Sequence, residues 1–164
     1  MAQTDSSTKE ILITKLFDAP RELVFAAWTD PQLLVRWYAP KGCSIRFLKL
    51  EPHTGGAFHS CIRTPDGYDC WCTGTYLEVT PHEQIVFSMC NADEQGNAIE
   101  PGQNGTPEDW PTKTVVTVTL TDVNGQTEMT LHQTAPEDVA KRTGAYPSWL
   151  EMFDKLAADL KGRV

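Results

Sequence analysis

The residues near the C-terminus place the strongest constraint on the fold. Trp149, Phe153, Leu156 and Leu160 recur at the spacing that puts side chains on one side of a helix. A helix over 147–161 would be about 22 Å long at about 1.5 Å per residue. Because so much apolar surface is unfavourable in water, this side of the helix must lie against an apolar surface of similar length.

Residues 43–134 can supply that surface, because short alternating runs separated by turn residues are typical of an antiparallel meander. The segment 92–112 is too long for a hairpin turn, so it is expected to form a lid or a mobile excursion. Strands are expected at 10–17, 44–50, 56–63, 69–79, 84–91, 113–122 and 127–134.

The last hairpin has a register that its turn predicts. Asn124-Gly125 favours a two-residue type I′ loop, which places Val123 opposite Gln126. Counting outward puts the apolar positions of both strands on one face and His132 on the other. The pairs expected on the buried face are Leu120 with Met129, Val118 with Leu131, and Val116 with Gln133.

Two short helices are expected between the first two strands. Pro20 can occupy the first position of one, and Asp30 and Pro31 suit the N-cap and first position of the other, which ends by Pro40. We expect a disordered tail at 1–9 and a single α+β domain over 10–164.

Charge and cysteine usage limit the partners. The net charge is −8 and the basic residues are scattered, whereas nucleic acids and anionic membranes need clustered Lys and Arg. No apolar run approaches the ~20 residues that cross a bilayer. The five cysteines, an odd number without an export signal, favour reduced thiols and a cytoplasmic location.

Several motifs recur in an order that resembles a known family. Asp18-Ala19-Pro20, Ala27-Trp28-Thr29-Asp30-Pro31, Gly74-Thr75-Tyr76 and Asp109-Trp110-Pro111 are similar to motifs of the activator-of-Hsp90-ATPase homologue family, within the START-like superfamily. The resemblance implies a helix-grip fold, in which a curved antiparallel sheet holds a long C-terminal helix with a cavity between them. Tyr38-Ala39 departs from the pattern, since the family more often has Trp and Gly there.

A curved sheet and a straight helix cannot meet along their full length, so some core side chains should line an unfilled gap. Gln133 and Tyr76 could supply the few polar groups that such a pocket uses. The residues expected to contact a ligand are Trp37, Phe58, Tyr76, Phe87, Met89, Met129, Leu131, Gln133, Trp149 and Phe153.

The first functional hypothesis is therefore binding of a small hydrophobic or amphipathic molecule, without a cofactor, a metal or defined catalysis. The second is an interaction module that stimulates a chaperone ATPase, as the resemblance implies. The third is a cyclase or hydrolase using Glu78, which could gain a raised pKa if it pointed into the cavity. His53, His82 and His132 are expected at the surface, and a homodimer is a further possible assembly.

The hairpin around Thr64-Pro65-Asp66-Gly67 leaves two registers open. If Arg63 lies opposite Tyr68, then His59, Cys61, Cys70 and Cys72 share one face, as a zinc site would require. If Gly67 is left-handed in a three-residue loop, Thr64 lies opposite Tyr68 and Cys61 opposite Trp71. In that register Cys70 and Cys72 lie on the other face, and Glu78 points inward unless a bulge intervenes.

Overall fold

The computed structural model describes residues 9–100, 102 and 109–162 of the 164-residue chain. Most of the expected tail at 1–9, and the middle of the expected excursion at 92–112, lie outside the described residues. In the part of the chain that is described, no helix is both long and apolar enough to cross a bilayer.

Seven strands form one antiparallel sheet in the order β1-β7-β6-β5-β4-β3-β2. The seven expected strands are all present, with ends that differ by at most two residues. The strands are β1 (Glu10–Phe17), β2 (Ser44–Leu50), β3 (Ala57–Arg63), β4 (Asp69–Thr80), β5 (Gln84–Ala92), β6 (Thr114–Val123) and β7 (Gln126–Pro136). The helices are α2 (Arg21–Thr29), α3 (Pro31–Leu34), α4 (Glu137–Thr143) and α5 (Ala145–Lys161).

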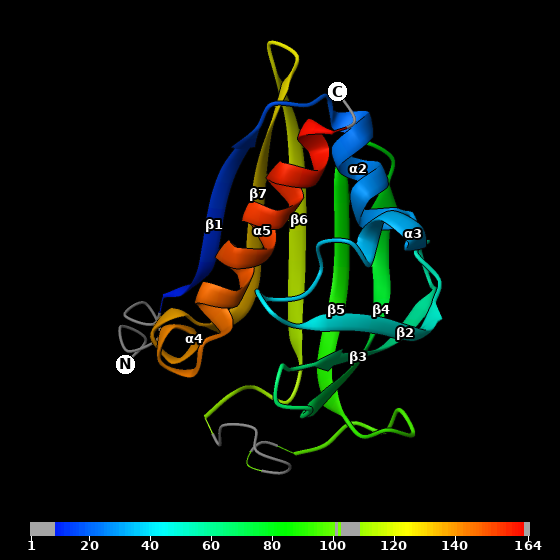
Figure 1. The fold of residues 1–164 in the computed structure, drawn as a ribbon, viewed down its shortest axis with the longest axis vertical. Coiled ribbons are helices and arrows are strands. Elements are labelled where there is room, and N and C mark those ends of the chain that lie inside the picture. Colours follow the sequence, from blue (N-terminus) through cyan, green and yellow to red (C-terminus); the bar gives the residue numbers. More distant parts are fainter. Residues whose placement is uncertain (1–8, 101, 103–108, 163–164) are drawn as a thin grey trace, which may run out of the picture.

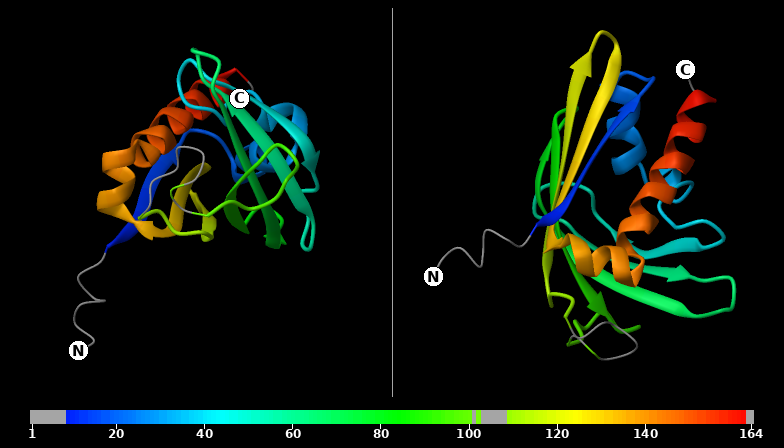
Figure 2. Two further views of the ribbon diagram at one scale, coloured as in Figure 1. Left: turned by 90° about the horizontal axis from the view of Figure 1, so that it is seen from below. Right: turned by 90° about the vertical axis from the view of Figure 1, so that its left-hand side faces the viewer.

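The sheet curves around the C-terminal helix. Figure 1 shows α5 lying across one face of the sheet, and Figure 2 shows the sheet bending toward the helix at the β2–β4 end. Gly74 helps the strands to approach closely, because a Cβ there would lie 1.8 Å from the Ser88 carbonyl oxygen and 2.4 Å from the Phe58 ring. This arrangement confirms the expected helix-grip fold.

The stripe on α5 is buried as expected: Trp149, Phe153, Leu156 and Leu160 are each at most 4% exposed. The helix begins at Ala145, two residues before the expected start. It follows α4 directly, because Gly144 ends α4 in the left-handed conformation with φ of 98°.

The two short helices near the N-terminus begin at or within one residue of their predicted starts. Pro20, expected at the first position of α2, is its N-cap instead. Asp30 and Pro31 have their predicted positions in α3, and the Asp30 carboxylate accepts a hydrogen bond of 3.0 Å from the Gln32 amide. The chain after α3 brings Trp37 into the core, where its indole N–H donates to the Ala27 carbonyl at 3.0 Å.

The β6–β7 hairpin has the predicted register. Val123 lies opposite Gln126, and the expected pairs on the buried face are all present. Asn124 and Gly125 both have positive φ, of 54° and 88°, as a type I′ turn requires. His132 lies on the outer face, where its Nε2 is 2.8 Å from a Glu10 carboxylate oxygen.

The β3–β4 hairpin adopts the second of the two registers. The Thr64 amide donates to the Tyr68 carbonyl, Gly67 has φ of 89°, and Cys61 lies opposite Trp71. Cys61 and Cys70 therefore face opposite sides of the sheet.

A β-bulge then turns the far end of β4. The pairing of β4 with β5 shifts by one residue between Tyr76 and Glu78, so Tyr76 is buried whereas Glu78 is exposed. The Glu78 carboxylate accepts hydrogen bonds from the Thr80 hydroxyl at 2.8 Å and the Gln84 amide at 3.2 Å. An inward-facing Glu78, the premise of the third hypothesis, is therefore wrong.

Candidate functional site

The ten residues expected to contact a ligand lie together between the sheet and α5. Nine of them are buried, and Met89 is half-buried against the same core. On the helix, Trp149 stacks on Phe153 with ring centroids 5.7 Å apart, and Phe153 lies 6.3 Å from Trp37. The structure therefore brings these residues into one aromatic core, while their role as ligand contacts stays a prediction.

On the β6–β7 side of this core, the polar atoms are paired. The Trp149 indole N–H donates to the Gln133 side-chain oxygen at 2.9 Å, and the Gln133 amide donates to the Thr114 hydroxyl at 3.0 Å. The Thr127 hydroxyl donates to the Ala19 carbonyl at 2.7 Å. This pairing satisfies the requirement that buried polar groups be hydrogen-bonded.

On the β3–β4 side, three hydroxyls lack such pairing. No hydrogen bond links the hydroxyl of Tyr38, Ser60 or Tyr76 to another residue within the described ranges. Ser60 and Tyr76 are only 4% and 6% exposed, and Tyr38 is half-buried. The Cys72 thiol donates a weak hydrogen bond of 3.8 Å to the adjacent Thr73 carbonyl, and the Cys90 backbone also contacts it. We call Tyr38, Ser60, Cys72 and Tyr76 the β4 polar cluster.

The four residues come from three segments that meet on the inner face of the sheet. Ser60 lies directly opposite Cys72, and Tyr76 lies on the same side of β4 as Cys72 because alternate residues share a side. The Tyr38 ring meets the Trp149 ring edge-on with centroids 5.9 Å apart, and the Tyr76 ring is 5.9 Å from the Phe58 ring. The cluster thus adjoins the aromatic core.

Burial keeps the titratable members of the cluster protonated. It raises the pKa of Tyr38 well above its usual range, and the neighbouring Cys72 and Tyr76 raise that pKa further. Burial also raises the pKa of Tyr76 to about 12 and, with a contribution from Cys90, that of Cys72 to about 12. At neutral pH the cluster therefore presents uncharged O–H and S–H groups.

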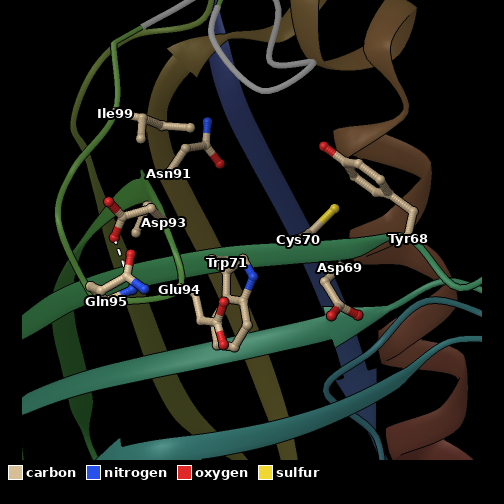
Figure 3. A pocket seen from close by; sticks show the side chains of 10 residues that line it. Tyr68, Asp69, Cys70, Trp71, Asn91, Asp93, Glu94, Gln95 and Ile99 are labelled. Carbon is tan, nitrogen blue, oxygen red and sulfur yellow. Dashed lines mark hydrogen bonds between the residues drawn. The ribbon is translucent and has the colours of Figure 1, made fainter.

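A hollow of about 620 Å³ opens beside the cluster, where β4 begins and β5 ends. Its walls are residues 68–71, residues 91–95 and Ile99. Figure 3 shows the Tyr68 and Cys70 side chains on one side of β4 and Trp71 on the other. The side that carries Cys70 continues to Cys72, which lies opposite Asn91, so this wall leads to the polar cluster.

The hollow is not the cavity expected from the sequence, because none of the ten expected residues lines it. A second hollow, of about 300 Å³, is lined by Arg21, Glu78 and residues of β5 and β6, and it contains none of the ten either. The larger hollow lies next to the aromatic core rather than within it.

Comparison with known proteins identifies the family. The family model described as Activator of Hsp90 ATPase homolog 1-like protein matches residues 18–161. The chain belongs to this family. No curated protein matches the chain.

Solved structures of bacterial proteins share the fold of this Hsp90-ATPase-activator-like chain. A protein of Arthrobacter aurescens has 24% identity and a TM-score of 0.80, and the match covers 95% of this chain and 88% of that one. A protein of Chromobacterium violaceum has 24% identity and a TM-score of 0.75, with coverage of 90% and 94%. The AHSA1 protein of Silicibacter pomeroyi has 18% identity and a TM-score of 0.76, with coverage of 95% and 100%.

Within this family member, the candidate metal ligands are separated. His59 and Cys61 lie on the outer side of the sheet, where the His59 ring is 5.2 Å from the Trp71 ring and its Nε2 is 3.2 Å from the Asp93 carbonyl oxygen. Cys70 and Cys72 lie on the inner side. Among the described residues, no three metal-ligating side chains gather, and all five cysteines are free.

Sequence reasoning missed Tyr38 and Ser60 as site residues. Tyr38 lies where the chain departs from the family's usual Trp-Gly, and that departure was the available signal. The second hairpin register places Ser60 on the inner face, but a sequence does not distinguish a paired hydroxyl from an unpaired one.

Proposed function

We propose that this chain binds a small apolar or amphipathic molecule on the concave face between the sheet and α5. The polar group of the molecule would lie against the β4 polar cluster, and its apolar part against the aromatic core. The family and the fold support a binding role in general, and the cluster points to this part of the face.

The observation that carries the proposal is the lack of partners for three hydroxyls in the cluster. A buried polar group without a hydrogen bond costs about 1–3 kcal/mol. Tyr76 is the clearest case, since it is 6% exposed and its ring is fixed between Phe58 and Phe87 at 5.9 Å from each. A ligand that supplies the missing hydrogen bonds would remove this cost.

The larger hollow supports the same location. Its volume of about 620 Å³ lies in the range of about 300–1,000 Å³ that is usual for small-molecule sites. Its inner wall carries Cys70 (Figure 3), and Cys72 and Tyr76 follow on the same side of β4, so a ligand could enter at this end of the sheet.

Native mass spectrometry of the purified protein, with binding of the uncharged dye Nile red, tests the proposal. We expect a copurifying small molecule or saturable Nile red fluorescence at one site. Cys72→Phe should fill the inner face and reduce dye binding at least about tenfold, the loss of about 1.4 kcal/mol. The matched control Cys90→Phe, on the other face of the sheet, should retain binding. No adduct and no saturable dye binding would refute the proposal.

The family description favours a second function, stimulation of a chaperone ATPase. We propose as its test the steady-state ATP hydrolysis rate of purified Hsp90 at increasing concentrations of the chain. A saturable rise in rate would support an interaction module, and an unchanged rate at saturating chain would exclude it for that chaperone.

We also propose a cytoplasmic location. Cys70 is exposed and Cys43, Cys72 and Cys90 are half-buried, yet all five cysteines are free thiols, as a reducing compartment would keep them. Fractionation of the native host, with immunodetection of the chain, tests this location; recovery outside the cytoplasmic fraction would contradict it.

A further inference from the structure

We infer that the ligand's polar group is an uncharged hydrogen-bond acceptor, such as a ketone, ester or amide carbonyl, which Tyr38 and Tyr76 bind through their hydroxyls. This inference rests on the proposed binding function and narrows its ligand class. It follows from which groups on the concave face are already paired and which are charged.

The buried face holds no charge that could pair with an ion. In the part of the chain that the structure describes, the buried polar side chains are all neutral, and none is Asp, Glu, Lys or Arg. The half-buried Lys155 ammonium already donates to the Ala39 carbonyl at 2.9 Å, next to Tyr38 rather than Tyr76. A carboxylate beside Tyr76 would therefore lose its hydration without gaining a cation, which is strongly unfavourable.

The polar groups that remain can all donate a proton. The hydroxyls of Tyr38, Ser60 and Tyr76 donate to no other described residue, whereas the Gln133 carbonyl oxygen, which can only accept, is occupied by the Trp149 indole. A ligand with donors alone would leave these O–H groups unpaired, because its own donors could bond only to the hydroxyl oxygens. One carbonyl oxygen has two lone pairs, so it can accept a hydrogen bond from each of the two phenols at once.

The two phenols border the same pair of aromatic rings. The Tyr38 ring is 6.0 Å from the Trp28 ring, and the Tyr76 ring is 5.9 Å from the Phe87 ring. Trp28 and Phe87 are themselves in contact at 6.3 Å, so both phenols line one part of the core. Tyr38 comes from the chain after α3 and Tyr76 from β4, so a carbonyl bound by both hydroxyls would connect the ligand to these two segments.

A matched series of ten-carbon probes tests the inference by competition with bound Nile red at pH 7. The probes are 2-decanone, decanoate, decylammonium and decane. We expect 2-decanone to displace the dye at a concentration at least about tenfold lower than decanoate or decylammonium, a difference of about 1.4 kcal/mol. Decane should be weaker than 2-decanone because it lacks the acceptor.

Phenylalanine variants assign the effect to the two hydroxyls. Tyr38→Phe and Tyr76→Phe should each weaken 2-decanone binding about three- to tenfold, as loss of one hydrogen bond predicts, and leave decane binding within about twofold. The carbonyl stretch of 13C-labelled 2-decanone should move to lower frequency on binding to the wild-type protein, and most of that movement should vanish in the double variant. Tyr146→Phe serves as the matched control.

The outcomes separate this inference from the proposed function. Two outcomes would make the inference wrong while Nile red still binds and the binding function stands. In the first, decanoate competes as well as 2-decanone. In the second, the double variant retains full ketone affinity and the full infrared shift. If neither Nile red nor any of the ten-carbon probes binds the wild-type protein, both are wrong.

Discussion

The two sides of the core differ in how they treat buried polar atoms. On the β6–β7 side, Gln133 joins the Trp149 indole to the Thr114 hydroxyl in a continuous set of hydrogen bonds. On the β3–β4 side, Ser60 and Tyr76 are buried to a similar degree, yet their hydroxyls have no partner within the described residues. Both sides belong to one sheet and pack against one aromatic core.

The difference indicates a division between framework and binding surface. Paired polar groups fix the position of α5 on the sheet, so their loss should lower stability. An unpaired buried hydroxyl does not stabilise the free protein, so its loss should weaken binding without lowering stability. Three variants and one titration test this division, in order of the expected loss of stability.

Trp149→Ala should produce the largest loss. Removal of this 4%-exposed indole leaves a cavity under α5 and leaves the Gln133 oxygen without its donor. We expect the free energy of unfolding to fall by about 3–5 kcal/mol in denaturant titration. A loss below about 1 kcal/mol would contradict the packing.

Gln133→Leu should cost less but still destabilise the protein. The variant keeps the volume of the side chain but leaves the Trp149 indole and the Thr114 hydroxyl unpaired. We expect a loss of about 1–3 kcal/mol, measured against the exposed control Gln32→Leu. Equal stability of the two variants would show that the paired side does not depend on this hydrogen-bonded link.

Alkaline titration should show that Tyr76 stays protonated in the folded protein. Its folded pKa of about 12 exceeds the unfolded value near 10. Its stabilising contribution is therefore full below pH 10 and declines as the pH rises from about 10 to about 12. The native phenolate absorbance at 295 nm and pH 11 should be equal in wild type and Tyr76→Phe.

The unfolded proteins supply the control for that titration. In guanidinium chloride at pH 12, Tyr76→Phe should show a smaller phenolate signal than the wild type, because one of four tyrosines is gone. A smaller signal for the native variant at pH 11 would mean that Tyr76 is accessible to water and ionises normally.

Ser60→Ala should cause no loss of stability. It removes a buried hydroxyl without a partner, so the free energy of unfolding should stay the same or rise, by up to about 1–3 kcal/mol. Its matched control, Thr127→Val, removes a buried hydroxyl that donates to the Ala19 carbonyl, and should cost about 1 kcal/mol or more. Equal losses in the two variants would remove the distinction between the two sides.

Local turn chemistry explains why the sequence predicted most of the fold. Asn124-Gly125 determined the β6–β7 register without knowledge of any distant residue, and the α5 stripe predicted which face of the sheet is covered. The β3–β4 register was left open because the turn residues favoured one pairing, while the expected inward position of Glu78 argued against it. The bulge between Tyr76 and Glu78 resolved that conflict, and bulges have no strong sequence signal.

The candidate site was predicted only in part, for a different physical reason. Hydrophobic periodicity identifies which residues are buried, so Phe153 and Met129 were found in the core as expected. It does not report whether a buried hydroxyl finds a partner, which depends on distances between separate segments. Tyr38 comes from the chain after α3, and its packing against Trp149 beside the cluster becomes visible only in the three-dimensional structure.

Thermal unfolding of the wild type and of Tyr38→Phe/Tyr76→Phe, with and without saturating 2-decanone, tests whether the two hydroxyls serve binding rather than stability. We expect the free double variant to be at least as stable as the wild type. We also expect the ketone to raise the melting temperature of the wild type more than that of the variant. A free double variant that is clearly less stable, with an equal rise on adding ketone, would contradict both expectations.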